Sequence, residues 1–431
     1  MKKITSIVLA LVMALSVFSV MAFAEDSDIV YKVISEEEKT CEVTGAKAGV
    51  VDLVIPATVD GYTVVAIGNR AFEKNPEIAT VEIPDTVETI GQFAFTKTAL
   101  YKNDANWENG VLYIGKFLII AKTSVEGEYA VKAGTTVMAD AAFRNCKKLT
   151  KVTLPEGMEK VSLLVFRDCE ALTEVVLPTT VKNIEAYAFV GCAALETVVL
   201  PENVEYIGNY AFNNSGITEI SIPANVKGIG KYAFCHCEDL TAISVAEGNE
   251  AYSSASGILY NKDKSTIVYV PNKADLTNFA IPETVKTIGA GAFEGAIIEE
   301  LVIPEGVTAI EAGAFEGCGN LKKITIPATV TAIDDTAFGG CEKVQITAEK
   351  GSVAYEFAEK NDLLPKILYG DVNGDGEVTS LDARWALQAV AMLRDLDEEQ
   401  FVRADVNKDG VLASIDARWI LQIVAGTREV K

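Results

Sequence analysis

The stretch LTEVVLPTTVKNIEAYAFVGCAA at residues 172–194 is followed directly by LETVVLPENVEYIGNYAFNNSG at 195–216, and LKKITIPATVTAIDDTAFGGCEK at 321–343 repeats the pattern. In each copy a phenylalanine follows 11 residues after a proline. Phe143, Phe166, Phe189 and Phe212 are spaced by 23 residues. A fixed period of this length is typical of a solenoid, in which each repeat buries its apolar face only by stacking on its neighbours.

Each repeat predicts one short strand and a return segment. Val175 and Leu177 are two residues apart and point to the same side, whereas Val176 points outward. Pro178 has no N–H to donate and ends the strand. The sequence therefore predicts short parallel strands joined by turns or short helices. The apolar positions of the return segment recur three to five residues apart: Val181, Ile184, Phe189 and Cys192.

The complete motif, L-x-x-[IV]-x-[IL]-P-x-x-V-x-x-I-x-x-x-A-F-x-x-C, resembles the BspA-like leucine-rich repeats of bacterial surface proteins. The resemblance implies an α/β solenoid of leucine-rich repeats, which we place within a domain at 25–366. Two inserts, at 107–122 and 255–271, predict strand–turn–strand hairpins. Residues 28–44 are expected to cap the first coil. A helical segment at 351–364 is expected to cap the last coil, which would otherwise expose apolar residues.

Residues 1–24 have the pattern of a secretory signal peptide. Lys2 and Lys3 precede the mostly apolar run 4–20, and Ala22-Phe23-Ala24 fits a cleavage site. A membrane anchor is the alternative, although it needs about 20 apolar residues with polar flanks and no cleavage site. No other apolar run approaches that length, so the sequence predicts an exported chain without a membrane span.

The mature chain is expected to be strongly acidic. Removing Lys2 and Lys3 changes the formal net charge from −23 to −25. This charge argues against nucleic acid and anionic membranes as partners, because both would repel it. An acidic chain could bind calcium, or its charges could serve solubility alone.

The cysteines follow the repeat. Six of the eight stand three residues after the repeat phenylalanine: Cys146, Cys169, Cys192, Cys237, Cys318 and Cys341. Other coils place Ser215, Thr98, Asn75 or Ala296 there, which predicts a column of small buried residues with free thiols. Disulfides between coils are the alternative. The only histidine, His236, lies between two cysteines, and three consecutive residues cannot all face one zinc ion.

The repeats carry no recognisable catalytic motif. There is no second histidine, no nucleophile elbow and no phosphate-cradling glycine loop, so we expect a protein that is not an enzyme.

The solenoid offers two candidate binding surfaces. The first is a flat face with little charge, which either suits protein contact more than sugar stacking or is ordinary sheet surface. It consists of outward strand positions: Glu82, Thr153, Val176, Val199, Ser221, Val302 and Thr325. A second column either packs on itself or offers rings to a sugar chain or a protein: Phe93, Tyr187, Tyr210 and Tyr232.

Two acidic loops follow the solenoid, DVNGDGEVTSLD at 371–382 and DVNKDGVLASID at 405–416. Calcium loops supply oxygen ligands from positions 1, 3, 5, 7, 9 and 12, with glycine at position 6. The first loop offers Asp371, Asn373, Asp375, the Glu377 carbonyl, Thr379 and Asp382. The second offers Asp405, Asn407, Asp409, the Val411 carbonyl and Asp416, with a water needed beside Ala413.

The charge of this region fits two calcium ions. Residues 370–431 contain 12 acidic and 7 basic side chains, a charge of −5. Two divalent ions would change that charge to −1. Only the segments after the loops, 383–393 and 417–426, are expected to be helical, with Ala383, Leu387 and Val390 on one face. Trp385 and Trp419 either contact a partner or pack internally.

A calcium loop followed by a helix, twice, with aspartate at position 12, closely resembles a type I dockerin, which we place at 370–431. The resemblance implies a small all-α domain that docks onto a cohesin domain of a scaffolding protein or cell-surface anchor. Near-symmetry implies that either half can face the partner. The residues that the resemblance assigns to docking are Ser380, Leu381, Arg384 and Gln388 in one half and Ser414, Ile415, Arg418 and Gln422 in the other.

Together these features predict a secreted, non-catalytic leucine-rich repeat protein. It would dock through a calcium-dependent dockerin onto a cellulosome-like or cell-surface scaffold, while the solenoid presents a protein- or glycan-binding surface. Two alternatives remain open: an accessory or enzymatic subunit of a polysaccharide-degrading complex, and a cell-surface adhesin.

Overall fold

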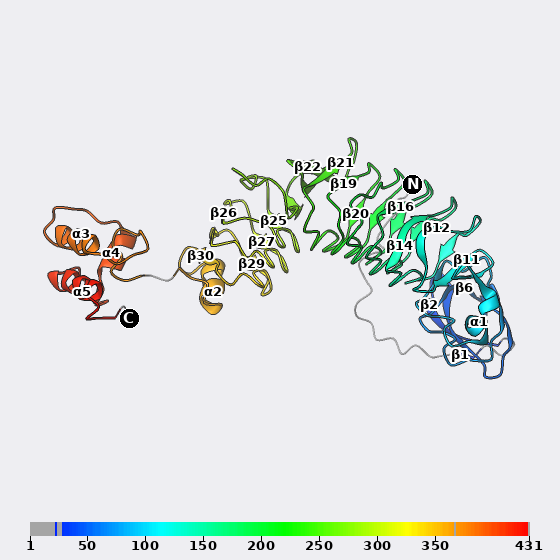
Figure 1. The fold of residues 1–431 in the computed structure, drawn as a ribbon. Helices are drawn as coiled ribbons and strands as arrows, with labels where there is room; N and C mark the ends of the chain where they lie inside the picture. Colours follow the sequence, from blue (N-terminus) through cyan, green and yellow to red (C-terminus); the bar gives the residue numbers. More distant parts are fainter. Residues whose placement is uncertain (1–21, 24–27, 366–367, 430–431) are drawn as a thin grey trace. The chain divides into compact units, whose positions relative to one another are not determined.

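The computed structural model describes residues 22–23, 28–365 and 368–429 (Figure 1). The predicted signal peptide lies outside the described residues, apart from β1 (Ala22–Phe23). The chain forms two compact units, each with its own apolar core. The first runs to Val344 and includes Ala348–Phe357, and the second contains Gln345–Thr347 and the chain from Ala358 onward.

The first unit opens with an antiparallel pair, β2 (Ile29–Ser35) and β3 (Thr40–Ala46), in the segment expected to form a cap. β3 then pairs in parallel with β6 (Tyr62–Ile67), which starts the coils. The remaining strands of the first coils are β4 (Asp52–Val54), β5 (Thr58–Val59), β7 (Thr80–Glu82) and β8 (Thr89–Ile90).

The coils that follow form parallel ladders with partners about one repeat apart. Val161 pairs with Ile184, and Ile184 pairs with Ile207, which lies 23 residues further on. The predicted solenoid of short parallel strands is therefore confirmed. One set of ladder strands is β12 (Glu126–Ala130), β14 (Lys148–Thr153), β16 (Glu174–Val176), β19 (Glu219–Ile222), β21 (Ala242–Val245), β26 (Glu300–Val302) and β28 (Lys323–Thr325). The other set is β13 (Val137–Met138), β15 (Lys160–Val161), β17 (Asn183–Ile184), β18 (Tyr206–Ile207), β20 (Gly228–Ile229), β25 (Thr287–Ile288), β27 (Ala309–Ile310) and β29 (Ala332–Ile333).

The segments around each phenylalanine are turns, not helices. In most coils the residues two before and two after it adopt left-handed backbone, as Tyr210 (φ 56°) and Asn214 (φ 54°) do on either side of Phe212. Left-handed residues cannot continue a right-handed helix, so the chain reverses at every coil. Two short helical segments stand before the first insert: α1 (Ala99–Lys102) and η1 (Asp104–Asn106).

Both inserts form three-stranded antiparallel meanders that rejoin the solenoid through a parallel pair. The first consists of β9 (Trp107–Glu108), β10 (Val111–Ile114) and β11 (Phe117–Ala121), and the second of β22 (Tyr252–Ala255), β23 (Ile258–Asn261) and β24 (Thr266–Tyr269).

Columns of identical residues fill the interior. The rings of Phe166 and Phe189 stack 5.5 Å apart, and those of Phe189 and Phe212 stack 5.2 Å apart. All eight cysteines are free and buried, which confirms the prediction of free thiols. The Cys192 thiol donates to the Phe166 carbonyl at 3.1 Å, so each thiol of the column can satisfy a carbonyl of the preceding coil.

The chain after the last coil contains β30 (Gln345–Thr347) and α2 (Val353–Lys360). Within the first unit, the Phe357 ring lies 5.8 Å from the Phe338 ring, the last of the phenylalanine column. The helix thus covers the apolar end of the column, as a capping segment must.

In its described residues after 368, the second unit contains the helices α3 (Ser380–Val390), α4 (Glu398–Ala404) and α5 (Ser414–Val424). The expectation that only the segments after the loops are helical was wrong, because α4 ends directly before the second loop. Asp397 and Gln400 form a reciprocal capping box that starts α4, and this pattern is visible in the sequence.

Candidate functional site

The first acidic loop folds around Asp371. Its carboxylate accepts hydrogen bonds from the amides of Gly374, Asp375 and Gly376 at 2.8–3.1 Å. Gly376, at position 6, has a φ of 90°, the left-handed backbone that the sharp turn requires. Three backbone amides of the loop therefore fix the position of the carboxylate at position 1.

Asp382, at position 12, closes the same loop. It accepts from the Asn373 amide at 3.0 Å and from both the amide and the hydroxyl of Thr379, at 2.8 and 2.9 Å. The carboxylates at positions 1 and 12 are thereby hydrogen-bonded to residues between them in the loop. The helix α3 starts at Ser380, within the same loop. The predicted ligand positions are brought together as one compact loop.

The second loop repeats this geometry. Asp405 accepts from the amides of Asp409 and Gly410, and Asp416 accepts from those of Asn407 and Ala413. Among the side chains expected to supply ligands, the loops differ at position 9, where Ala413 has no hydroxyl and the first loop has Thr379.

Four aspartates of the loops are almost fully buried. Asp382 and Asp416 are 0% exposed, and Asp371 and Asp405 are 4% and 7% exposed. None of them forms an ion pair with any part of the chain that the structure describes. Burying an uncompensated carboxylate is costly, so these loops fit a bound cation. Among the described residues no three Asp, Glu, His or Cys side chains form a metal cluster by themselves, and the predicted ligand set also needs amide, carbonyl and hydroxyl oxygens.

Most of the residues expected to dock are on the surface of α3 and α5. Leu381 and Ile415 are 43% and 37% exposed. Ser380, Arg384, Ser414 and Arg418 are exposed, and Gln388 and Gln422 are partly exposed. Sequence reasoning missed Leu387 and Leu421, which are both 45% exposed and lie 34 residues apart, the spacing of the two loops.

The predicted helical face of Ala383, Leu387 and Val390 lies within α3, but it is not buried along its whole length. Ala383 and Ala386 are buried in the core of the unit, whereas Leu387 is exposed. Because alanine side chains are small, α3 and α5 can approach closely. Leu387 and Leu421 then lie on the outer side of the two helices. Trp385 packs against this core with the Arg394 guanidinium 3.6 Å from its ring centre, and Arg428 lies 3.2 Å from the Trp419 ring centre.

On the solenoid, three tyrosines form a stacked ladder. The ring centres of Tyr187 and Tyr210 are 4.9 Å apart, and those of Tyr210 and Tyr232 are 5.1 Å apart, with nearly parallel planes. Both faces of the Tyr210 ring are therefore covered by its neighbours. Phe93 is not part of this ladder, and its ring lies 5.6 Å from the Arg70 guanidinium.

The only histidine joins the coils on either side of the second insert. His236 Nδ1 lies 2.8 Å from Glu294 Oε1, and its backbone amide donates to Glu294 Oε2 at 2.8 Å. Burial raises the pKa of the Glu294 carboxyl. Burial also raises the pKa of the Cys237 thiol to about 11, which keeps it in the unreactive thiol form.

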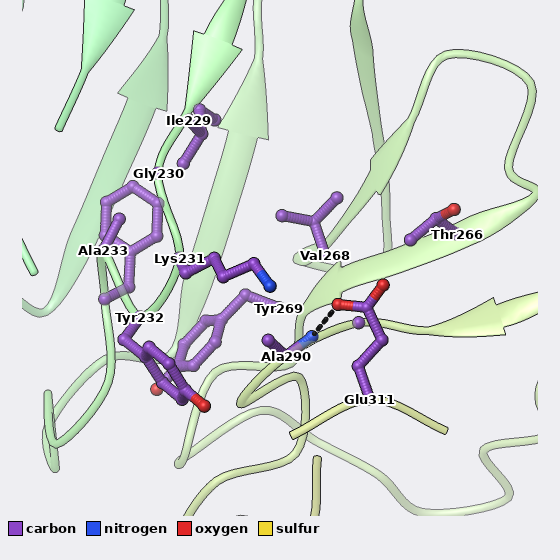
Figure 2. A pocket seen from close by; sticks show the side chains of 12 residues that line it. Ile229, Gly230, Lys231, Tyr232, Ala233, Thr266, Val268, Tyr269, Ala290 and Glu311 are labelled. Carbon is purple, nitrogen blue, oxygen red and sulfur yellow. Dashed lines mark hydrogen bonds between the residues drawn. The ribbon is translucent and has the colours of Figure 1, made fainter. Parts of the chain in front are cut away.

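Each insert borders a cavity. At the second insert, a cavity of about 150 Å³ is lined by Lys231, Tyr232, Tyr269 and Glu311, and the Ala290 amide donates to Glu311 Oε2 at 3.2 Å (Figure 2). At the first insert, a cavity of about 600 Å³ is lined by Phe93, Lys122 and Arg144, among others.

The repeats match a known family over most of the chain. Six copies of the BspA type leucine rich repeat region cover residues 54–169, 128–241 and 268–355. The chain belongs to the BspA-type leucine-rich repeat family. Residues 369–424 match the dockerin type I domain, so this family member carries a dockerin at its C-terminal end. Neither family is catalytic, dockerin type I domains bind calcium, and a dockerin implies a cohesin partner.

Solved structures of bacterial leucine-rich repeat proteins are similar to this chain. A leucine-rich repeat protein from Eubacterium ventriosum is 28% identical, with 57% of this chain and 72% of that chain covered and a TM-score of 0.51. A leucine rich cell surface protein from Faecalibacterium prausnitzii is 25% identical over 81% of this chain and 98% of that chain, with a TM-score of 0.41. No curated protein matches. No helix among the described residues of this leucine-rich repeat protein has the length and apolar character of a membrane span.

Proposed function

We propose that this protein is secreted and docks, through a calcium-ordered dockerin at 370–431, onto a cohesin of a cellulosome-like or cell-surface scaffold. The solenoid, at 25–366, is then a non-catalytic domain displayed on that scaffold. The observation that carries the proposal is the pair of equivalent loops, each with two buried aspartates that have no cationic partner within the described chain.

Two calcium ions, one in each loop, would compensate these carboxylates. The first would be held by Asp371, Asn373, Asp375, the Glu377 carbonyl, Thr379 and Asp382. The second would be held by Asp405, Asn407, Asp409, the Val411 carbonyl, Asp416 and a water. Because the loops lead directly into α3 and α5, binding the ions stabilises the surface of both helices.

The docking surface would consist of one half of the dockerin at a time. Leu381 and Ile415 are the exposed apolar residues at equivalent positions, flanked by Arg384 and Arg418. Leu387 and Leu421 extend each surface with a second apolar side chain. The predicted set is completed by Ser380, Gln388, Ser414 and Gln422.

The near-symmetry of the halves gives a direct test. In calcium, a cohesin should bind the full chain with Leu381→Asp or with Ile415→Asp, because the other half remains intact. The double variant should lose binding by at least a hundredfold. Equal binding by the double variant and the unmodified chain would disprove docking through these helices. The exposed Leu393→Asp serves as a matched control, since it lies outside the proposed surface.

The solenoid would contact a protein through its outward strand face. Val199 is 82% exposed and Val302 is 66% exposed on this face. A hollow of about 630 Å³ beside Val199 and Ser221 has no aromatic lining, which disfavours sugar stacking. Replacing Val199 by Asp should abolish capture of a protein partner while leaving cohesin docking unchanged. The tyrosine ladder, in which both faces of the Tyr210 ring are occupied by its neighbours, is assigned to stabilising the coils.

A further inference from the structure

A charged cavity lies between the first hairpin insert and the coils around it. Its volume of about 600 Å³ is in the range of small-molecule sites. The insert contributes Ile120 and Lys122, and the coils contribute Phe93, Arg144 and Asn145. No acidic side chain lines it, although the chain contains 61 acidic and 38 basic residues.

Arg144 is the unusual residue of this cavity. Its Nε atom is buried and has no hydrogen-bond partner. Within the described residues its guanidinium forms no ion pair and donates no hydrogen bond. A buried donor without an acceptor is destabilising, so the guanidinium is poised for an acceptor that the chain does not supply. Lys122, in contrast, is already paired with Asp104 at 2.7 Å.

The next coil contains an equivalent arginine whose charge is compensated. Arg144 follows Phe143 directly, and Arg167 follows Phe166 in the same way. Arg167 Nε donates to Asp168 Oδ2 at 3.2 Å. Asn145 stands where Asp168 would be, with nearly the same backbone, φ 62° against 59°. The neutralising carboxylate is thus replaced by an amide where the coil borders the cavity.

The second insert provides a contrast. Its smaller cavity contains Lys231, but Glu311 lines the same space and supplies the opposite charge (Figure 2). An uncompensated cation is therefore a property of the first cavity, not of every junction between an insert and a coil.

The chemistry of the walls indicates the ligand. A guanidinium presents parallel N–H donors that match the two oxygens of a carboxylate. Phe93 and Tyr101, which also line the cavity, offer apolar ring surface beside it. We propose that this cavity binds a carboxylate carried on a small ring, with Arg144 as its anchor. Such a ring occurs in acidic sugars and in aromatic acids.

Calorimetric titration of the full chain tests the proposal. Glucuronate and benzoate represent the two sources, and methyl glucoside is the neutral control. At least one acid should bind with a dissociation constant of about 0.1–1 mM, as expected for a ligand of this size. The acid that binds identifies the source. Failure of both acids to bind, or equal binding of methyl glucoside, would overturn the proposal.

Three variants make the test specific to Arg144. Arg144→Gln should weaken binding at least tenfold. Asn145→Asp should do the same, because it rebuilds the Arg167–Asp168 pair of the next coil and occupies the guanidinium. Arg167→Gln is the matched control and should bind like the unmodified chain. Unchanged affinity in Asn145→Asp, whose fold the next coil shows to be compatible with aspartate, would contradict the assignment. This test is independent of calcium and of cohesin docking.

Discussion

Thr379 and Ala413 occupy equivalent positions in the two loops, yet only Thr379 has an oxygen to offer. Its hydroxyl accepts from the Leu381 amide at 3.2 Å and donates to Asp382 at 2.9 Å. The first loop therefore has a side-chain cap for its helix, and the second has none.

Replacing each of these residues by its counterpart in the other loop should change the stability of the dockerin in opposite directions. Thr379→Ala should lower the stability of the dockerin by about 1 kcal/mol, the usual value of a lost helix cap. Ala413→Thr should raise it by a similar amount and strengthen calcium binding in the second loop. Thermal unfolding of the full chain in calcium checks both. A change of the same sign in the two variants would contradict the equivalence of the loops.

Asp140 provides a residue-scale test in the solenoid. Burial, reinforced by the charge of Glu185, raises its pKa from an ordinary 3.8 to about 7. The folded chain thus keeps this carboxyl protonated up to about pH 7, whereas the unfolded chain releases the proton near pH 4. Raising the pH from 4 to 7 therefore removes stability through this group.

Asp140→Asn should abolish this loss. Its melting temperature should exceed that of the unmodified chain at pH 8, and the difference should shrink as the pH falls through 7 toward 4. Glu185→Gln should give a smaller gain of the same sign. A difference between Asp140→Asn and the unmodified chain that is equal at pH 4 and pH 8 would show that the pKa of Asp140 is not raised.

At the scale of elements, the second insert interrupts the hydrogen bonding between coils. Phe212 N donates to Ala233 O, and Phe293 N donates to Ala314 O, each in the next coil. In the described chain Phe234 N makes no such bond. Side chains join the coils here instead, through His236 with Glu294 and through the Tyr232 hydroxyl, which donates to Ala312 O at 3.0 Å.

Removing the Glu294 side chain should loosen this junction. Glu294→Ala removes the acceptor of the part-buried His236 amide, which should cost about 1 kcal/mol, the usual net value of one hydrogen bond. Hydrogen exchange should speed up around 232–236 and 291–296, while the coils around Phe166 remain protected. Glu299→Ala, which removes only an exposed ion pair with Lys322, is the control. Equal protection at the junction in both variants would contradict this role.

The sequence predicted the elements that repeat and missed those that occur once. The 23-residue period identified the parallel coils, the phenylalanine column and the buried free thiols, because the same contacts recur in every coil. Among the described residues, the α4 helix has no counterpart in the other half of the dockerin, so a comparison of the two halves did not reveal its capping box. The outward position of Leu387 depends on how α3 and α5 pack, which periodicity along one helix does not determine. The His236–Glu294 pair joins residues 58 positions apart across an insert.

At the scale of the whole molecule, the two units are stabilised in different ways. The solenoid is stabilised by repeated apolar contacts between coils, with free thiols and stacked rings in its interior. In its described residues the dockerin has a small core of six buried apolar residues beside four buried aspartates, so we expect it to depend on compensation of charge. Calcium removal should therefore affect only one of the two.

The most direct test is cohesin binding by the full chain, measured by calorimetry in calcium and again in EDTA, with circular dichroism on both samples. We expect tight binding in calcium and none in EDTA, while the β-sheet signal of the solenoid persists. Undiminished cohesin binding in EDTA would contradict the claim that calcium orders the docking surface.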